Sequence, residues 1–119
     1  MRALLSWRAA MGILFRSAAA GDLAALAELA GELGHPVAPA ELLPRLERVL
    51  ADPAQAVLVA EQTGTVLGWL HVQEFRALTS PPSALVVGFV LAEGARGRGL
   101  GRALLAQAEA WARARGLTS

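Results

Sequence analysis

Three glycines alternate with larger side chains in the segment Arg96–Gly101, which reads Arg-Gly-Arg-Gly-Leu-Gly. Glycine has no Cβ atom, so such a backbone can curl and approach a ligand closely. An apolar run precedes the segment and a helical pattern follows it. The first turn of a helix offers unpaired N–H groups and a positive dipole end, which together bind phosphate. Arg96, Arg98 and Arg102 add charges that can grip phosphate oxygens, so the sequence predicts a phosphate-binding loop.

The first half of the chain predicts one strand and two helices. An apolar run at 13–16 is compatible with a strand, and Asp22 opens a helical pattern that ends at Gly34. A second helical pattern covers 39–50. It contains Pro44, which removes an interior N–H group. Either this helix kinks at the proline, or it starts just before it.

The second half predicts three strands and a helix. A β-branched run at 56–60 is followed by a turn at 62–65 and a return strand at 66–75. On the return strand, period-two alternation places on one face Trp69, His71, Gln73 and Phe75, and on the other Leu70, Val72 and Glu74. Residues 76–83 are predicted as a loop, and 84–91 as a strand that is apolar on both faces and therefore central.

The helix after the glycines has an apolar stripe that consists of Leu100, Ala103, Leu104, Ala108 and Trp111. Two common phosphate-binding motifs do not fit the loop before it. No Gly-Lys-Ser/Thr follows the glycines, which excludes a Walker loop. A dinucleotide loop needs a glycine at the sixth position, where Arg102 or Leu104 stands instead.

The loop does match the acetyl-coenzyme A loop of the GNAT acetyltransferase family, Arg/Gln-x-x-Gly-x-Gly/Ala. The chain resembles this family in element order over roughly residues 13–119, which supplies the strand–loop–helix context that the motif requires. The resemblance implies a single α+β domain at 13–119, with a mostly antiparallel central sheet flanked by helices. It also implies that the chain ends before the family's last strands, with 117–119 as the beginning of a fifth strand.

The resemblance further implies transfer of an acetyl group from acetyl-coenzyme A to a primary amine by direct attack. The pyrophosphate would then lie on the loop residues Arg96, Gly97, Arg98, Gly99, Leu100, Gly101 and Arg102. The pantetheine arm would pair like an extra strand with Phe89, Val90 and Leu91. A backbone N–H near Leu91 would polarise the thioester carbonyl.

A base must take a proton from the attacking amine, because an ammonium group is not a nucleophile. The strand at 84–91 carries no acid, so Glu74 and His71 on the preceding strand are the candidates. Packing and a solvated strand face are the simpler roles for these two residues. His35 lies between the two predicted helices, where the family lines its acceptor site, although a surface turn is its simpler role.

The composition limits the partners. Eleven basic and ten acidic residues give a net charge of +1, which makes no electrostatic case for nucleic acid or an anionic membrane. The absence of cysteine excludes disulfides and thiolate metal sites, no metal is expected, and a cytoplasmic location is the default. Residues 1–12 are expected to be a poorly ordered extension, and translation could start at Met1 or Met11.

A second reading competes with the enzyme. The family's last helix often carries a tyrosine that protonates the departing thiolate, and this chain has no tyrosine. An inactive remnant, or a module that binds coenzyme A without turnover, fits that observation. Exposed strand edges also predict completion by a second copy, as a homodimer. The acceptor, whether a small molecule or a peptide amine, is not specified by these residues.

Overall fold

The computed structural model describes residues 12–118. Its strands and helices are β1 (Ile13–Ser17), α2 (Leu23–Glu32), α3 (Pro39–Ala51), β2 (Gln55–Gln62), β3 (Thr65–Ala77), β4 (Ser80–Leu91) and α4 (Leu100–Ala114). Two short 3-10 turns, η1 (Ala20–Asp22) and η2 (Glu93–Ala95), precede α2 and the glycine loop. This is the predicted order of elements. Except for Gly12, the expected N-terminal extension lies outside the described residues.

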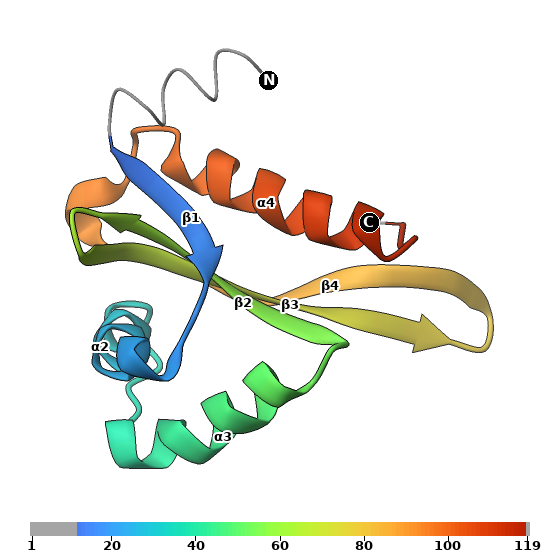
Figure 1. Cartoon of the computed structure of the whole chain (residues 1–119), viewed down its shortest axis with the longest axis horizontal. Coiled ribbons are helices and arrows are strands. Elements are labelled where there is room, and N and C mark those ends of the chain that lie inside the picture. The colour runs from blue at the N-terminus through green and yellow to red at the C-terminus, as the bar shows by residue number, and fades with distance from the viewer. Residues whose placement is uncertain (1–11, 119) are drawn as a thin grey trace.

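The four strands form one antiparallel sheet in the order β1-β2-β3-β4. Helices α2 and α3 lie on one face of the sheet and α4 lies on the other (Figure 1). The predicted fold class, a mixed α+β domain with helices flanking an antiparallel sheet, is confirmed.

Strand β3 divides the core between these two faces, because successive side chains of a strand point to opposite sides. Leu70 and Val72 pack with Leu104 and Ala108 of α4. Trp69 packs on the other face, against a cluster that contains Leu26, Leu46, Val57 and Val59. The predicted assignment of β3 side chains to the two faces is therefore confirmed for these residues.

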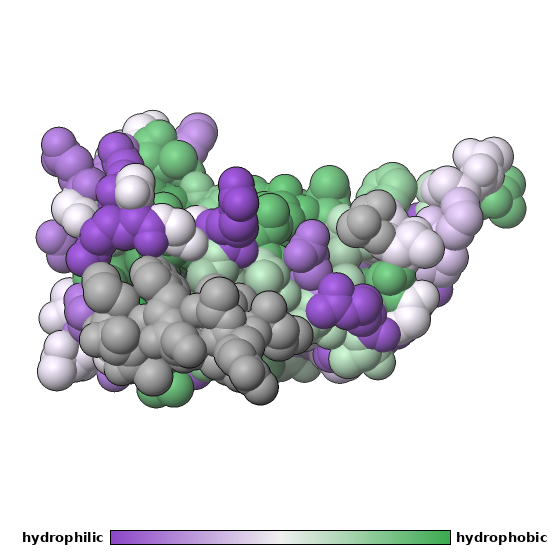
Figure 2. All heavy atoms as spheres, turned by 90° about the horizontal axis from the view of Figure 1, so that it is seen from above, coloured by the Kyte–Doolittle hydropathy of each residue, from purple (hydrophilic) through white to green (hydrophobic). Residues whose placement is uncertain are grey.

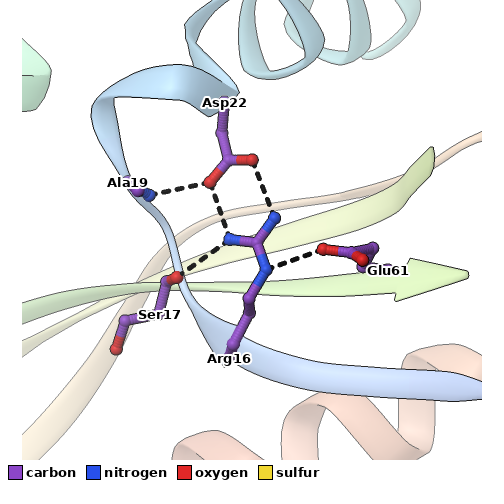
Figure 3. A network of polar contacts seen from close by, with 5 residues as sticks. All are labelled: Arg16, Ser17, Ala19, Asp22 and Glu61. Carbon is purple, nitrogen blue, oxygen red and sulfur yellow. Dashed lines mark hydrogen bonds and ion pairs between the residues drawn. The ribbon is translucent and has the colours of Figure 1, made fainter. Parts of the chain in front are cut away.

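An ion-pair network ties the junction of β1 and α2 to β2 (Figure 3). The Arg16 guanidinium donates to both carboxylate oxygens of Asp22, at 2.8 and 2.9 Å, and its Nε donates to Glu61 at 2.8 Å. The Ala19 N–H also donates to Asp22, at 2.7 Å. The Arg16 contact is the main cause that lowers the pKa of Asp22. Asp22 lies at the start of α2 as predicted, but it is 8% exposed and its carboxylate accepts from Arg16 and from the Ala19 N–H.

Strands β3 and β4 form a long hairpin that projects from the rest of the molecule (Figures 1 and 2). The predicted loop at 76–83 is wrong, because β3 continues to Ala77 and β4 begins at Ser80. Pro81 and Pro82 therefore lie inside a strand. Prolines are tolerated there because β4 is at the edge of the sheet, where fewer N–H groups are needed for pairing.

The prediction that the strand at 84–91 is central is also wrong within the described residues. β4 ends the sheet, and its apolar side chains Leu85, Val86 and Val87 are 40–45% exposed. Apolar composition on both faces therefore does not mean burial on both faces here. One parallel bridge joins Ser83 to Thr118, where the expected fifth strand begins.

The helices depart from expectation in two details. α3 begins at Pro39 and contains Pro44, so a start just before Pro44 is wrong. On α4 the predicted stripe is buried except at Trp111, which is half-buried, while Ala112 is buried in addition. The Arg115 guanidinium lies over the Trp111 ring, 4.4 Å from its centre, and shields part of the ring from solvent.

Candidate functional site

The loop before α4 has the backbone geometry that its glycines permit. Gly97 and Gly99 both have φ of +77°, in the left-handed region that other residues rarely adopt. Gly99 is the N-cap of α4, and it turns the chain directly into the helix. The space around the missing Cβ of each glycine is open, so the loop backbone is accessible to a ligand.

The first turn of α4 presents free donors at this loop. The first intrahelical bond runs from the Ala103 N–H to the Gly99 carbonyl, at 3.1 Å. The N–H groups of Leu100, Gly101 and Arg102 precede it and have no intrahelical acceptor. Among the described residues, none of the three loop arginines pairs with an acid. The loop therefore combines open backbone donors with uncompensated positive charge.

Strand β4 contains a bulge just before the part of the strand that leads to the loop. Its ladder with β3 pairs Gly88 with His71 and then Val86 with Val72, which leaves Val87 as an extra residue. A bulge bends its strand and reverses which backbone groups face the neighbouring strand. The backbone N–H and C=O groups that face outward from β4 therefore belong to a different alternate set of residues before and after Val87.

Beyond the bulge, β4 presents backbone groups on its outer edge. The Ala92 N–H faces β3, since it donates to the Leu67 carbonyl at 2.7 Å. By alternation, the N–H groups of Leu91 and Phe89 face away from β3. The Leu91 carbonyl accepts from Arg96 Nε at 3.2 Å, which agrees with this direction. An extended ligand could pair with this edge as a further strand would.

Gly101 joins this edge to the helix. A Cβ at that position would lie 3.3 Å from Leu91 Cδ1 and 3.4 Å from Phe89 Cζ. These contacts are tight but short of a clash, so only a very small side chain fits between α4 and the end of β4. The start of α4 therefore lies directly against the end of β4.

A cavity of about 670 Å³ lies on the other face of the sheet, against α2, α3 and the connection between them. Its polar lining residues are His35, Glu41, Arg45 and His71, and the rest of the lining is mainly apolar. Trp69 lines the cavity as well. A Cβ on Gly88 would approach the Trp69 ring to 2.7 Å, so that glycine makes room for the indole.

His71 is the titratable group that the sheet contributes to this cavity. Its Nε2 lies 2.8 Å from the Oε1 atom of Gln55. Burial lowers the pKa of His71 below its ordinary value of 6.5. The ring is therefore neutral at pH 7, which is the state of a base.

Glu74, the other candidate base, lies on the opposite face of β3 with Leu70 and Val72. It contacts Arg76 at 3.4 Å and does not line the cavity. The structure therefore does not bring the two candidates together. His35 lines the cavity as an exposed residue, and Phe75 is exposed and outside it.

Two polar residues near His71 were missed by sequence analysis. Gln55 is the first residue of β2, and Asp52 lies in the turn that leads from α3 to β2. The Gln55 side-chain nitrogen donates to Asp52 at 2.9 Å. No spacing in the sequence relates these residues to His71, because the contact depends on the pairing of β2 with β3.

Three solved structures show the same fold with a TM-score of 0.79 each. A GNAT family acetyltransferase from Staphylococcus aureus is 20% identical, and the match covers 88% of this chain and 81% of that one. A transcriptional regulator from Bacillus halodurans is 25% identical, with 88% and 77% covered. An aminoglycoside 6'-N-acetyltransferase from Acinetobacter haemolyticus is 22% identical, with 89% and 75% covered. The fold is thus that of GNAT acetyltransferases.

The sequence also matches the model of the acetyltransferase (GNAT) family over residues 23–119, a range that includes the loop, the cavity and α4. The chain therefore belongs to the GNAT acetyltransferase family, and the resemblance based on Arg96–Gly101 is confirmed. A search of the curated proteins finds no match to the sequence.

The described part of the chain also lacks two kinds of feature. Between residues 12 and 118 there is no group of three or more His, Asp or Glu side chains placed to hold a metal ion. In the same range, no helix has both the length and the apolar character needed to cross a bilayer.

Proposed function

We propose that this protein transfers an acetyl group from acetyl-coenzyme A to a primary amine, with His71 as the base. The observation that carries the proposal is that the Gly97–Arg102 loop lies beside the outer edge of β4 at Phe89–Leu91. We call these two segments the donor half of the site, and the cavity lined by His71 the acceptor half. Membership of the GNAT family supports acetyl transfer in general.

In the donor half, the residues fit the chemistry of acetyl-coenzyme A. The pyrophosphate would accept hydrogen bonds from the free N–H groups at the start of α4, in the field of the helix dipole. Arg98 and Arg102 would add charge from the side. The amides of the pantetheine arm would pair with the outward N–H of Phe89 and Leu91. This arrangement would direct the thioester toward the bulge at Val87.

His71 would act from the acceptor half. It pairs with Gly88 in the sheet, next to the bulge, and it lines the cavity. The neutral ring takes one proton from the ammonium group of the acceptor. The amine nitrogen then attacks the thioester carbonyl carbon, so that a C–N bond forms as the C–S bond breaks. Coenzyme A leaves as a thiolate and takes the second proton that the nitrogen loses.

The proposed acceptor is a primary amine of a small molecule or of a peptide. The cavity offers a mainly apolar wall that also carries Glu41, Arg45 and His35. The substrate of the aminoglycoside enzyme among the solved structures is not assigned to this chain.

A second candidate function is binding of coenzyme A without turnover. The observation that favours it is the absence of tyrosine from the chain, because the family often uses a tyrosine to protonate the thiolate. In that case the donor half would bind acetyl-coenzyme A, and no acetyl group would be transferred.

Titration of acetyl-coenzyme A by calorimetry tests the proposal. The wild-type chain is expected to bind saturably, and Gly99→Glu is expected to abolish binding because it places a carboxylate at the helix N-terminus. Gly94→Glu is the matched control, because it adds the same charge to the same exposed stretch at a residue without positive φ. Binding that survives in Gly99→Glu would contradict the proposed donor half.

Turnover is then measured as release of free thiol from acetyl-coenzyme A with a panel of primary amines. Thiol release that depends on the amine supports the transferase. Tight binding without release for every amine would favour the second candidate function.

A further inference from the structure

A chain of three side chains leads from the turn after α3 to the cavity. Asp52 Oδ2 accepts from Gln55 Nε2 at 2.9 Å, and Gln55 Oε1 lies 2.8 Å from His71 Nε2. Each link has the length of a good hydrogen bond. The three residues come from three elements, since Asp52 follows α3, Gln55 begins β2 and His71 lies in β3.

The chemistry of these groups fixes the direction of every hydrogen bond. An ionised carboxylate can only accept, so the amide of Gln55 must turn its NH₂ group toward Asp52. Its carbonyl oxygen then faces His71, and that oxygen can only accept as well. His71 must therefore donate from Nε2. In a neutral imidazole the other nitrogen, Nδ1, is then an acceptor.

Asp52 is itself held in place and charged. Its Oδ1 atom accepts from the Ala54 N–H at 2.9 Å, and the Gln55 N–H donates to the Asp52 carbonyl at 3.2 Å. The contacts with Gln55 and then Ala54 lower the pKa of Asp52. The carboxylate end of the chain is therefore fixed in position by the tight turn that contains it.

We propose that Asp52 and Gln55 are positioning residues that hold His71 in the tautomer with its proton on Nε2 and its acceptor nitrogen, Nδ1, available to the cavity. Nε2 is occupied by Gln55, and Gln55 does not line the cavity, so Nδ1 is the nitrogen left for a ligand there. The catalytic consequence rests on the proposed function, in which Nδ1 takes the proton of the acceptor amine. The tautomer itself does not depend on that function.

The tautomer is measured by long-range ¹H–¹⁵N correlation spectra of the histidine rings, recorded at a pH where both rings are neutral. The chain contains only His35 and His71, and a His35→Gln variant assigns their signals. In the wild type, His71 is expected to show a protonated Nε2 and an unprotonated Nδ1. Exposed His35 is the internal reference, with averaged signals from both tautomers. An averaged His71, or one with its proton on Nδ1, would overturn the proposal.

Asp52→Asn gives the sharper prediction. Its oxygen must remain at the Ala54 N–H, so its new NH₂ group faces Gln55 and forces that amide to turn around. The Gln55 NH₂ group then faces Nε2 of His71, which must accept, so the ring proton is expected on Nδ1. Gln55→Leu, which removes the link, is expected to give averaged signals. An unchanged tautomer in both variants would refute the role of Asp52 and Gln55.

Activity then separates this inference from the proposed function. If His71 is the base, the inverted tautomer of Asp52→Asn lowers kcat by about 100-fold, while the KM for acetyl-coenzyme A stays unchanged. If a variant inverts the tautomer and keeps the full kcat, His71 is not the base. Asp52 and Gln55 would still set the tautomer of His71. The spectra are read without any substrate, so a chain that fails to turn over still tests the tautomer.

Discussion

The donor half and the acceptor half differ in which atoms they offer to a ligand. The loop at Gly97–Arg102 offers mainly backbone N–H groups, and its conformation depends on two glycines with positive φ. The cavity offers side chains, and its half-buried His71, the proposed base, contacts Gln55 from the neighbouring strand. The loop is continuous in sequence, whereas the cavity gathers residues from α2, α3, β2 and β3. A substitution in the loop is therefore expected to act by changing the backbone conformation. A substitution in the cavity is expected to act by removing a side-chain functional group.

The largest effect is expected from His71→Gln. It removes the base while keeping a polar side chain of similar size, so kcat is expected to fall by about 100-fold or more. Affinity for acetyl-coenzyme A, measured by calorimetry, should not change, because His71 is absent from the donor half. Glu74→Gln is the control on the opposite face of β3, and it should keep the wild-type kcat. Equal losses in both variants would contradict the division into two halves.

The next effect concerns stability rather than either half. Arg16→Met leaves the Asp22 carboxylate buried without its cation, and the free energy of unfolding is expected to fall by about 3 kcal/mol. Arg76→Met removes an exposed pair at 3.4 Å and is expected to cost less than about 0.5 kcal/mol. Denaturant unfolding of both variants gives the comparison. Similar values for the two would show that the Arg16 network is no stronger than a surface pair.

The pH dependence of stability should reveal the same network. The pKa of Asp22 in the folded chain lies below its ordinary value of 3.8, so the unfolded chain binds more protons in acid. Its stabilising contribution is complete above 3.8 and is lost as the pH falls through the lower, folded-state pKa. The free energy of unfolding, measured between about pH 5 and pH 2, should therefore fall less steeply in Asp22→Asn than in wild type. Parallel curves would refute this.

The smallest effect is expected from Gly99→Ala. An alanine in the left-handed region costs about 1 kcal/mol, and a loop that relaxes from this strain loses its alignment of N–H groups. Affinity for acetyl-coenzyme A should fall about fivefold to tenfold. Asparagine tolerates this conformation better, so Gly99→Asn should bind more tightly than Gly99→Ala. Gly94→Ala, at a glycine without positive φ, should leave affinity unchanged.

The same contrast explains what could be predicted from sequence. The loop at 96–101 was predictable because its motif, strand and helix are consecutive, and the alternation along β3 correctly placed Trp69 and His71 on one face. Gln55 and Asp52 were not predictable, because their contact with His71 depends on the register of β2 with β3. The hairpin at 76–83 was mistaken for a loop, since two prolines are typical of loops unless the strand lies at an edge.

Those prolines also bear on how the protein behaves at high concentration. An exposed edge strand with apolar side chains is a template on which other chains pair and aggregate. Pro81 and Pro82 have no N–H to offer an incoming strand, and Thr118 already uses the Pro82 carbonyl and the Ala84 N–H. The beginning of β4 is therefore protected from intermolecular pairing. The outer N–H groups of Phe89 and Leu91 keep their capacity to pair, so a ligand that binds there would also protect the protein from aggregation.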